Sequence, residues 1–134
     1  MIYRKFQDIE LSGLGLGMMR LPVIDGNDGV VDENAAAEMI DCAYKSGINY
    51  FDTAWGYHDG NSELVAGKYL SKYPRESYYL ATKFPGYDLS NMGKWRKYLR
   101  NSLKNVKRSI LISICSIMSM KETLTHTLIP NMGF

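Results

Sequence analysis

Three side chains of this sequence could move a proton, and all three lie next to strand-like segments. Asp52 and Tyr57 belong to one run, Gly47–Tyr57, and Lys83 closes a later apolar run, Tyr78–Lys83. A phenol can donate a proton, but its ordinary pKa of about 10 is high, and a neighbouring ammonium lowers that pKa. A carboxylate beside the ammonium keeps it charged and fixes its position. These residue types therefore indicate a proton-transfer site rather than a core.

The strands that must position these residues alternate with helices. The pattern predicts strands over Leu14–Met18, Ile48–Asp52 and Tyr78–Lys83, each separated from the next by a helical segment. Strands joined by helical crossovers are parallel, and the connections are right-handed. Their carboxyl ends then share one edge. We therefore expect the acid and the amine at neighbouring strand ends, with the phenol in the loop between them.

The two connecting helices have recognisable boundaries. Asp32 is a suitable N-cap for the first helix, and Gly47 suits the left-handed position after its end. The apolar stripe of this helix is Ala36, Met39, Ile40, Ala43 and Tyr44. A second helix is predicted to begin at Asn61 or Ser62 and to end before Pro74.

The start of the chain allows a choice between two α/β folds. Tyr3–Phe6 and Ile9–Leu11 are predicted to form a small hairpin. Gly15 and Gly17 give a Gly-x-Gly, but a loop follows instead of a helix start, so the phosphate cradle of a Rossmann fold is not predicted. A segment of a (β/α)8 barrel fits better, because catalytic groups there sit at the carboxyl ends of strands.

A set of motif residues extends beyond the three chemical groups. In chain order they are Asp52, Thr53, Ala54, Tyr57, Ser62, Glu63, Gly67 and Lys83. At these spacings they resemble the aldo-keto reductase family. The resemblance implies that residues 1–94 are the N-terminal portion of a (β/α)8 TIM barrel, about three βα units. It covers the chain only to about residue 94.

The resemblance also implies a function for the parent protein. It would be an oxidoreductase that reduces an aldehyde or ketone, a small carbonyl substrate, by hydride transfer from NADP(H) or NAD(H). Tyr57 would be the general acid, Lys83 would lower its pKa, and Asp52 would orient Lys83. A His completes this set in the family, but no His stands in a matching context here. His58 is interpreted as a loop residue, with a substrate contact as the alternative.

Residues near the end of the first strand would approach the cofactor. By the resemblance, Met18, Met19 and Arg20 lie near the nicotinamide and the substrate. The run Gly15–Pro22 also looks like a bacterial subgroup that carries a C-terminal ferredoxin-like domain. This sequence has no iron–sulfur ligands, and no metal site is predicted.

Composition limits the class of protein. The chain has 134 residues, whereas a whole (β/α)8 barrel needs about 250. No apolar run is long enough to span a membrane, and the N-terminus has no apolar core of a signal peptide, so a cytoplasmic protein is expected. Cys42 and Cys115 have no metal-ligand spacing, and Cys42 is predicted to be buried in a helix.

The charge distribution changes near residue 94. Residues 1–94 carry 9 Lys and Arg against 13 Asp and Glu, whereas residues 95–134 carry 7 against 1. We explain this break by a single-base deletion near the Lys94 codon. Restoring one G, with allowed codons, yields an acidic amphipathic helix and then an apolar strand that ends in His at the position of Ile117. Residues 95–134 are therefore expected to be a frameshifted, poorly ordered tail, and His126 is not a substitute for the missing His.

The alternative is that the tail is functional. Its apolar residues at helical spacing are Trp95, Leu99, Leu103 and Val106, and basic residues surround them. That pattern is typical of a membrane-surface helix or of a phosphate-binding helix. The chain would then be a non-catalytic interaction protein whose basic tail binds anionic surfaces. The preferred interpretation predicts no nucleic-acid or membrane partner, no detectable reductase activity and no tight NAD(P)H binding by this chain.

Overall fold

The computed structural model describes residues 1–86, 88–107 and 113–116. The chain opens with an antiparallel hairpin, β1 (Tyr3–Phe6) and β2 (Ile9–Ser12), which confirms the predicted hairpin. The side chain of Asn49 ties it to the rest of the molecule. Its amide accepts a hydrogen bond from Ser12 N–H at 2.8 Å and donates to Glu10 O at 2.9 Å.

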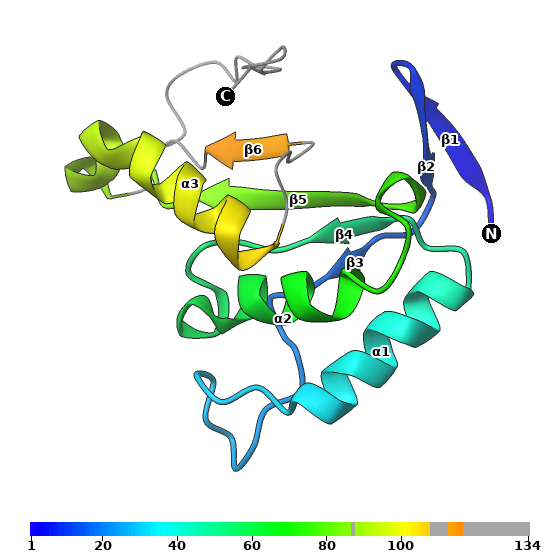
Figure 1. Cartoon of the computed structure of the whole chain (residues 1–134), viewed down its shortest axis with the longest axis horizontal. Helices are drawn as coiled ribbons and strands as arrows, with labels where there is room; N and C mark the ends of the chain where they lie inside the picture. The colour runs from blue at the N-terminus through cyan, green and yellow to red at the C-terminus, as the bar shows by residue number, and fades with distance from the viewer. Residues whose placement is uncertain (87, 108–112, 117–134) are drawn as a thin grey trace.

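In the described part of the chain, four parallel strands form the main sheet in the order of the chain. They are β3 (Leu16–Gly17), β4 (Tyr50–Asp52), β5 (Tyr79–Phe84) and β6 (Ser113–Ser116). Each neighbouring pair is parallel, which confirms the predicted topology. Figure 1 shows these strands side by side, with a helix in each connection. Within the described residues the sheet is open rather than closed into a barrel.

The α-helices that connect these strands within the described residues are α1 (Glu33–Lys45), α2 (Asn61–Leu70) and α3 (Trp95–Asn105). They cover one face of the sheet, because side chains from all three connections enter one core. That core includes Ile40 from α1, Leu70 from α2 and Val106 after α3, together with Phe51 and Leu80 from the strands. Burying this apolar face is what holds the layers together.

The boundaries of α1 follow the predicted capping residues. Asp32 Oδ1 accepts hydrogen bonds from Asn34 N–H at 3.1 Å and Ala35 N–H at 3.0 Å. Gly47 adopts a φ of 89° after the helix end, as predicted. The prediction that Cys42 is buried is wrong, because its side chain is exposed. The buried positions of α1 are Ala36, Ile40 and Ala43, and Cys42 falls on the opposite side of the helical turn.

Alternation along the strands divides their side chains between two faces. Phe51 of β4 and Leu80 of β5 point to the helices and are buried. Asp52 and Lys83 therefore point to the other face, where they remain partly accessible.

The region beyond residue 94 contains a helix and a strand among the described residues. α3 lies over 95–105 and contacts both α2 and β5. Residues 117–134, which include Ile117 and His126, lie outside the described residues. The division of the chain at residue 94 and the poor order of its tail stay predictions.

Candidate active site

Asp52 and Lys83 meet at the carboxyl ends of β4 and β5. The Lys83 ammonium forms an ion pair with the Asp52 carboxylate and donates a second hydrogen bond to Thr53 O at 3.0 Å. The Lys83 side chain is 17% exposed and that of Asp52 is 31% exposed. This partial burial strengthens the pair relative to one in water. The sequence-based expectation that these two groups come together is consistent with this geometry.

Tyr57 joins the pair from the loop after β4. Its ring centroid lies 4.8 Å from Lys83 Nζ. Two backbone hydrogen bonds fix the loop, from Trp55 N–H to Lys83 O at 3.2 Å and from Tyr57 N–H to Ala54 O at 3.2 Å. The acid, the amine and the phenol therefore form one cluster, which we call the Asp52–Tyr57–Lys83 cluster.

Electrostatics keep the amine of this cluster charged. Burial lowers the pKa of the Lys83 ammonium, but hydrogen bonds with Asp52 and Tyr57 outweigh it and hold that pKa above its ordinary value. A charged ammonium beside a phenol is the arrangement that stabilises a phenolate. The cluster can therefore support proton donation by the phenol.

The chain reverses sharply just after Tyr57. His58, Asp59 and Gly60 have φ values of 53°, 54° and 92°, so three consecutive residues adopt the left-handed conformation. This conformation is unfavourable for residues with a Cβ, so surrounding contacts must hold it. α2 begins at Asn61 and ends at Leu70, before Pro74, which confirms the predicted bounds, and Gly60 is its N-cap.

The three residues predicted near the cofactor differ in exposure. The Met18 side chain is fully buried in the core, whereas Met19 is 57% exposed and Arg20 is also exposed. The backbone of Met18 is fixed to β4 by its N–H, which donates to Asp52 O at 2.8 Å. This segment therefore starts next to the Asp52–Tyr57–Lys83 cluster.

The sequence did not predict that several polar residues beside the cluster are buried. The side chains of Thr53, His58, Ser62, Glu63 and Thr82 are buried. Their partners are distant in sequence, and single polar residues carry no periodic signal. Ser62 and Glu63 of the motif gave the one available signal of buried polar contacts, because Ser and Glu are seldom fully buried without partners.

The described residues contain neither a cluster of metal-ligand side chains nor a membrane-spanning helix. No group of three His, Cys, Asp or Glu side chains in that part of the chain could hold a metal ion. Across the same residues, no helix has the length and apolar character needed to cross a membrane.

Comparison with known proteins places these features in a family. The model of the aldo/keto reductase family matches residues 13–111. The chain is similar to the NADH-specific methylglyoxal reductase of Escherichia coli (strain K12), with 41% identity over 76 residues. The matched region makes up 57% of this chain but only 23% of that enzyme. The chain therefore spans under a quarter of the length of this relative.

Solved structures show the same fold. The holo form of an aldo-keto reductase from Bacillus halodurans is 26% identical with a TM-score of 0.70, covering 87% of this chain and 40% of that chain. An aldo-keto reductase from Klebsiella pneumoniae in complex with NADPH is 18% identical with a TM-score of 0.68, covering 85% and 39%. The second likeness shows the fold alone. Such neighbours are (β/α)8 barrels, of which the described sheet is an open part. Because the family model matches most of its residues, the chain belongs to the aldo/keto reductase family of oxidoreductases.

Proposed function

We propose that the parent protein of this chain reduces a small aldehyde or ketone with a nicotinamide cofactor, and that Asp52, Tyr57 and Lys83 form its proton-donating site. The observation that supports this most is the contact of one ammonium, Lys83, with both the Asp52 carboxylate and the Tyr57 ring.

The chemistry divides between the cofactor and the protein. The bound cofactor supplies the hydride that reduces the carbonyl carbon. Tyr57 donates the proton to the carbonyl oxygen, and the charged Lys83 stabilises the phenolate that Tyr57 becomes. Asp52 holds Lys83 in position, so the positive charge is in place before negative charge develops on oxygen. Met19 and Arg20 are the exposed residues that we assign to the side of the site facing cofactor or substrate.

The 134-residue chain alone is proposed to be inactive. Gly15 and Gly17 precede a loop rather than a helix start and form no phosphate cradle, so the parent must hold the cofactor elsewhere, and this chain matches only 23% of the Escherichia coli relative. We expect no oxidation of NADH or NADPH above background when the purified chain is given methylglyoxal, the substrate named for the Escherichia coli relative. Both cofactors belong in the assay because that relative is NADH-specific. Sub-micromolar NADPH affinity in isothermal titration calorimetry would contradict this proposal.

The proton-donating role is tested in the full-length parent. The gene segment, with the reading frame restored at Lys94, would be expressed together with its Tyr57→Phe variant. General acid catalysis contributes roughly 10²–10⁴-fold, so we expect kcat/KM to fall by at least about 10². A Tyr57→Phe enzyme with the kcat/KM of the unsubstituted enzyme would refute the role of Tyr57.

The exposed face of α3 favours a second candidate function, binding of a phosphate polymer. The exposed cations of α3 are Arg96, Lys97, Arg100 and Lys104, and Lys107 follows in the turn after the helix. Among the described residues none of these five forms an ion pair. Membrane insertion is less well supported, because Val106 of the apolar stripe is fully buried in the core. Fluorescence anisotropy with a labelled single-stranded oligonucleotide tests this. Affinity that falls steeply with salt and is lost in an Arg96→Gln, Arg100→Gln variant would support it.

A further inference from the structure

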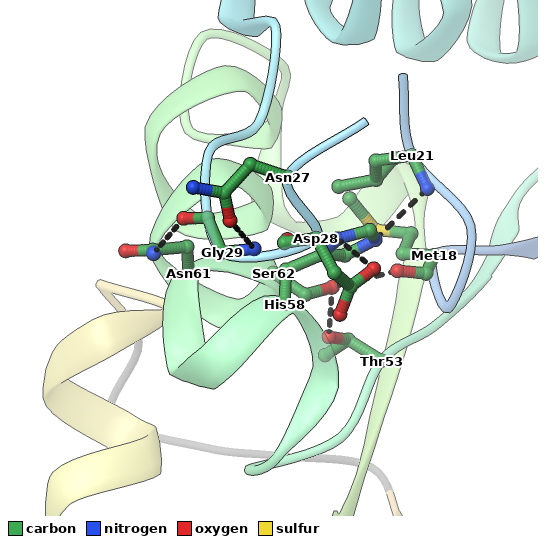
Figure 2. Close-up of polar contacts among 9 residues, drawn as sticks. All are labelled: Met18, Leu21, Asn27, Asp28, Gly29, Thr53, His58, Asn61 and Ser62. Carbon is green, nitrogen blue, oxygen red and sulfur yellow. Dashed lines mark hydrogen bonds and ion pairs between the residues drawn. The ribbon is translucent and has the colours of Figure 1, made fainter. Parts of the chain in front are cut away.

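His58 follows Tyr57 directly, and its side chain is held more tightly than a loop residue requires. The residue is 2% exposed and adopts the left-handed conformation, with a φ of 53°. Its two ring nitrogens both have partners, and both partners come from the segment between β3 and α1 (Figure 2). His58 thus joins the stretch that carries Tyr57 to the segment between β3 and α1.

The contacts assign the tautomer of His58. Leu21 N–H donates a hydrogen bond to Nε2 at 3.0 Å, so Nε2 must be an unprotonated acceptor. The ring proton is therefore on Nδ1, which lies 2.8 Å from Asp28 O and donates to it. The Asp28 carboxylate also lies near, with Oδ1 at 3.1 Å from Nδ1. One neutral tautomer satisfies both backbone contacts.

Ser62, at the start of α2, holds the other end of the segment that His58 contacts at Leu21. Ser62 Oγ donates to Met18 O at 2.9 Å. Because this bond uses the hydroxyl proton of Ser62, Thr53 Oγ1, which lies 2.7 Å from Ser62 Oγ, is the donor between the two hydroxyls. Asn61 Nδ2 donates to Gly29 O at 2.8 Å. In Figure 2, the contacts of His58, Asn61 and Ser62 reach residues 18–29, and Thr53 contacts Ser62.

We propose that His58 is a positioning residue, which together with Ser62 sets the distance between Tyr57 and the exposed pair Met19 and Arg20. Ser62 fixes the carbonyl of Met18 and His58 fixes the amide of Leu21, so both ends of the four-residue segment are held by the stretch that carries Tyr57. This inference rests on the proposed function, because it gives the segment a role only if Tyr57 donates the proton. We call this arrangement the His58–Ser62 clamp.

Two substitutions separate the hydrogen bond that His58 makes with Leu21 from the one that it makes with Asp28. In His58→Asn, the side chain tolerates the left-handed conformation, and its amide nitrogen can replace Nδ1 toward Asp28 O but cannot reach Leu21. In His58→Gln, the longer amide can place an acceptor where Nε2 lies. We expect amide hydrogen exchange of Leu21 to become at least tenfold faster in the Asn variant and to stay close to that of the original chain in the Gln variant.

The positioning role needs a measurement at Tyr57 itself. We expect the ring resonances of Tyr57 in NMR spectra to shift in His58→Asn and to return toward their original positions in His58→Gln. A change confined to Leu21, with Tyr57 unmoved in a folded Asn variant, would reduce His58 to a structural residue and overturn the proposal. If the variants do not fold, the nitrogen shifts of His58 in the original chain decide, because a proton on Nε2 is incompatible with the clamp.

A control variant separates this proposal from the proposed function. Tyr57→Phe removes the phenol but leaves the His58 contacts in place, so the Leu21 exchange rate and the His58 nitrogen shifts should be unchanged. If Tyr57→Phe leaves the full-length reductase active while the clamp measurements succeed, the proposed function fails and the geometry of the clamp stands. If Tyr57→Phe abolishes activity, but neither His58 substitution changes the Leu21 exchange rate or the Tyr57 ring resonances, the clamp alone fails.

Discussion

At the scale of single residues, Asp52 and Lys83 are held together by their opposite charges at the ends of two neighbouring strands. Their placement at the ends of two predicted parallel strands already indicated that they would meet, and they form an ion pair. His58 could not be interpreted in this way. Its partners, Leu21 and Asp28, lie 37 and 30 residues away in the sequence, and no local pattern links them. Contacts made by loop residues cannot be predicted from the sequence pattern, because periodicity exists only within helices and strands.

The Asp52–Lys83 pair should contribute stability that depends on pH. The pKa of Lys83 is raised in the folded state, so its contribution is fully present below about pH 10.4, the unfolded value, and is lost as the pH rises through the folded value. We expect a double-mutant cycle with Asp52→Asn and Lys83→Met to give a coupling free energy of about 1 kcal/mol at pH 7. This value lies between those typical of exposed and of buried ion pairs, because the pair is partly buried. Chemical denaturation at pH 7 and again above pH 11 measures it.

The exposed pair of Glu33 and Lys68 provides the matched control. Both side chains are about half exposed, so solvent screens their attraction. The same cycle with Glu33→Gln and Lys68→Met should therefore give a smaller coupling. A coupling between Asp52 and Lys83 no larger than that of the control pair would contradict the electrostatic account of the cluster.

Among the elements, α2 links the motif residues to the packing of the next helix. Glu63 is fully buried, and its two oxygens accept hydrogen bonds from Thr82 of β5 at 2.7 Å and from Asn105 of α3 at 2.9 Å. One turn later, Gly67 allows the backbone at the end of α3 to approach closely. The sequence predicted the bounds of α1 and the strand order well, because caps and apolar stripes are local signals. The contact of α2 with α3 depends on single residues and was not predicted.

A methyl group at Gly67 tests whether α3 packs on α2 as described. A Cβ there would lie 2.1 Å from Asn105 O and 2.7 Å from Val106 Cα, which are backbone atoms that cannot rotate away. We expect Gly67→Ala to destabilise the chain by about 1–3 kcal/mol, as overpacking does. If α3 does not occupy this position, the same change should stabilise the helix by about 1 kcal/mol, because Ala forms helices better than Gly. Thermal unfolding gives the sign, and amide shifts of Asn105 and Val106 report whether α3 has moved.

At the scale of the whole molecule, the described part of the chain is an open parallel sheet with helices on one face. Asp52 and Lys83 point to the opposite face, which in the barrels of structural neighbours is the interior. An open sheet also leaves strand edges with unpaired backbone groups, which favour association with other chains. This architecture agrees with a parent protein longer than 134 residues, as the Escherichia coli relative is.

The balance of charge along the chain changes sign near residue 94. α3 contains no acidic residue, although acidic residues outnumber basic ones in the preceding 94 residues. We expect resequencing of genomic DNA from the Asp88 codon to beyond the Phe134 codon to recover one G at Lys94, followed by a frame that encodes further strands and helices. Mass spectrometry of the native protein should then find acidic peptides after Lys94. Peptides that match Trp95–Asn105, with no further barrel sequence downstream, would instead establish the basic helix as genuine and make its binding to phosphate polymers the leading function.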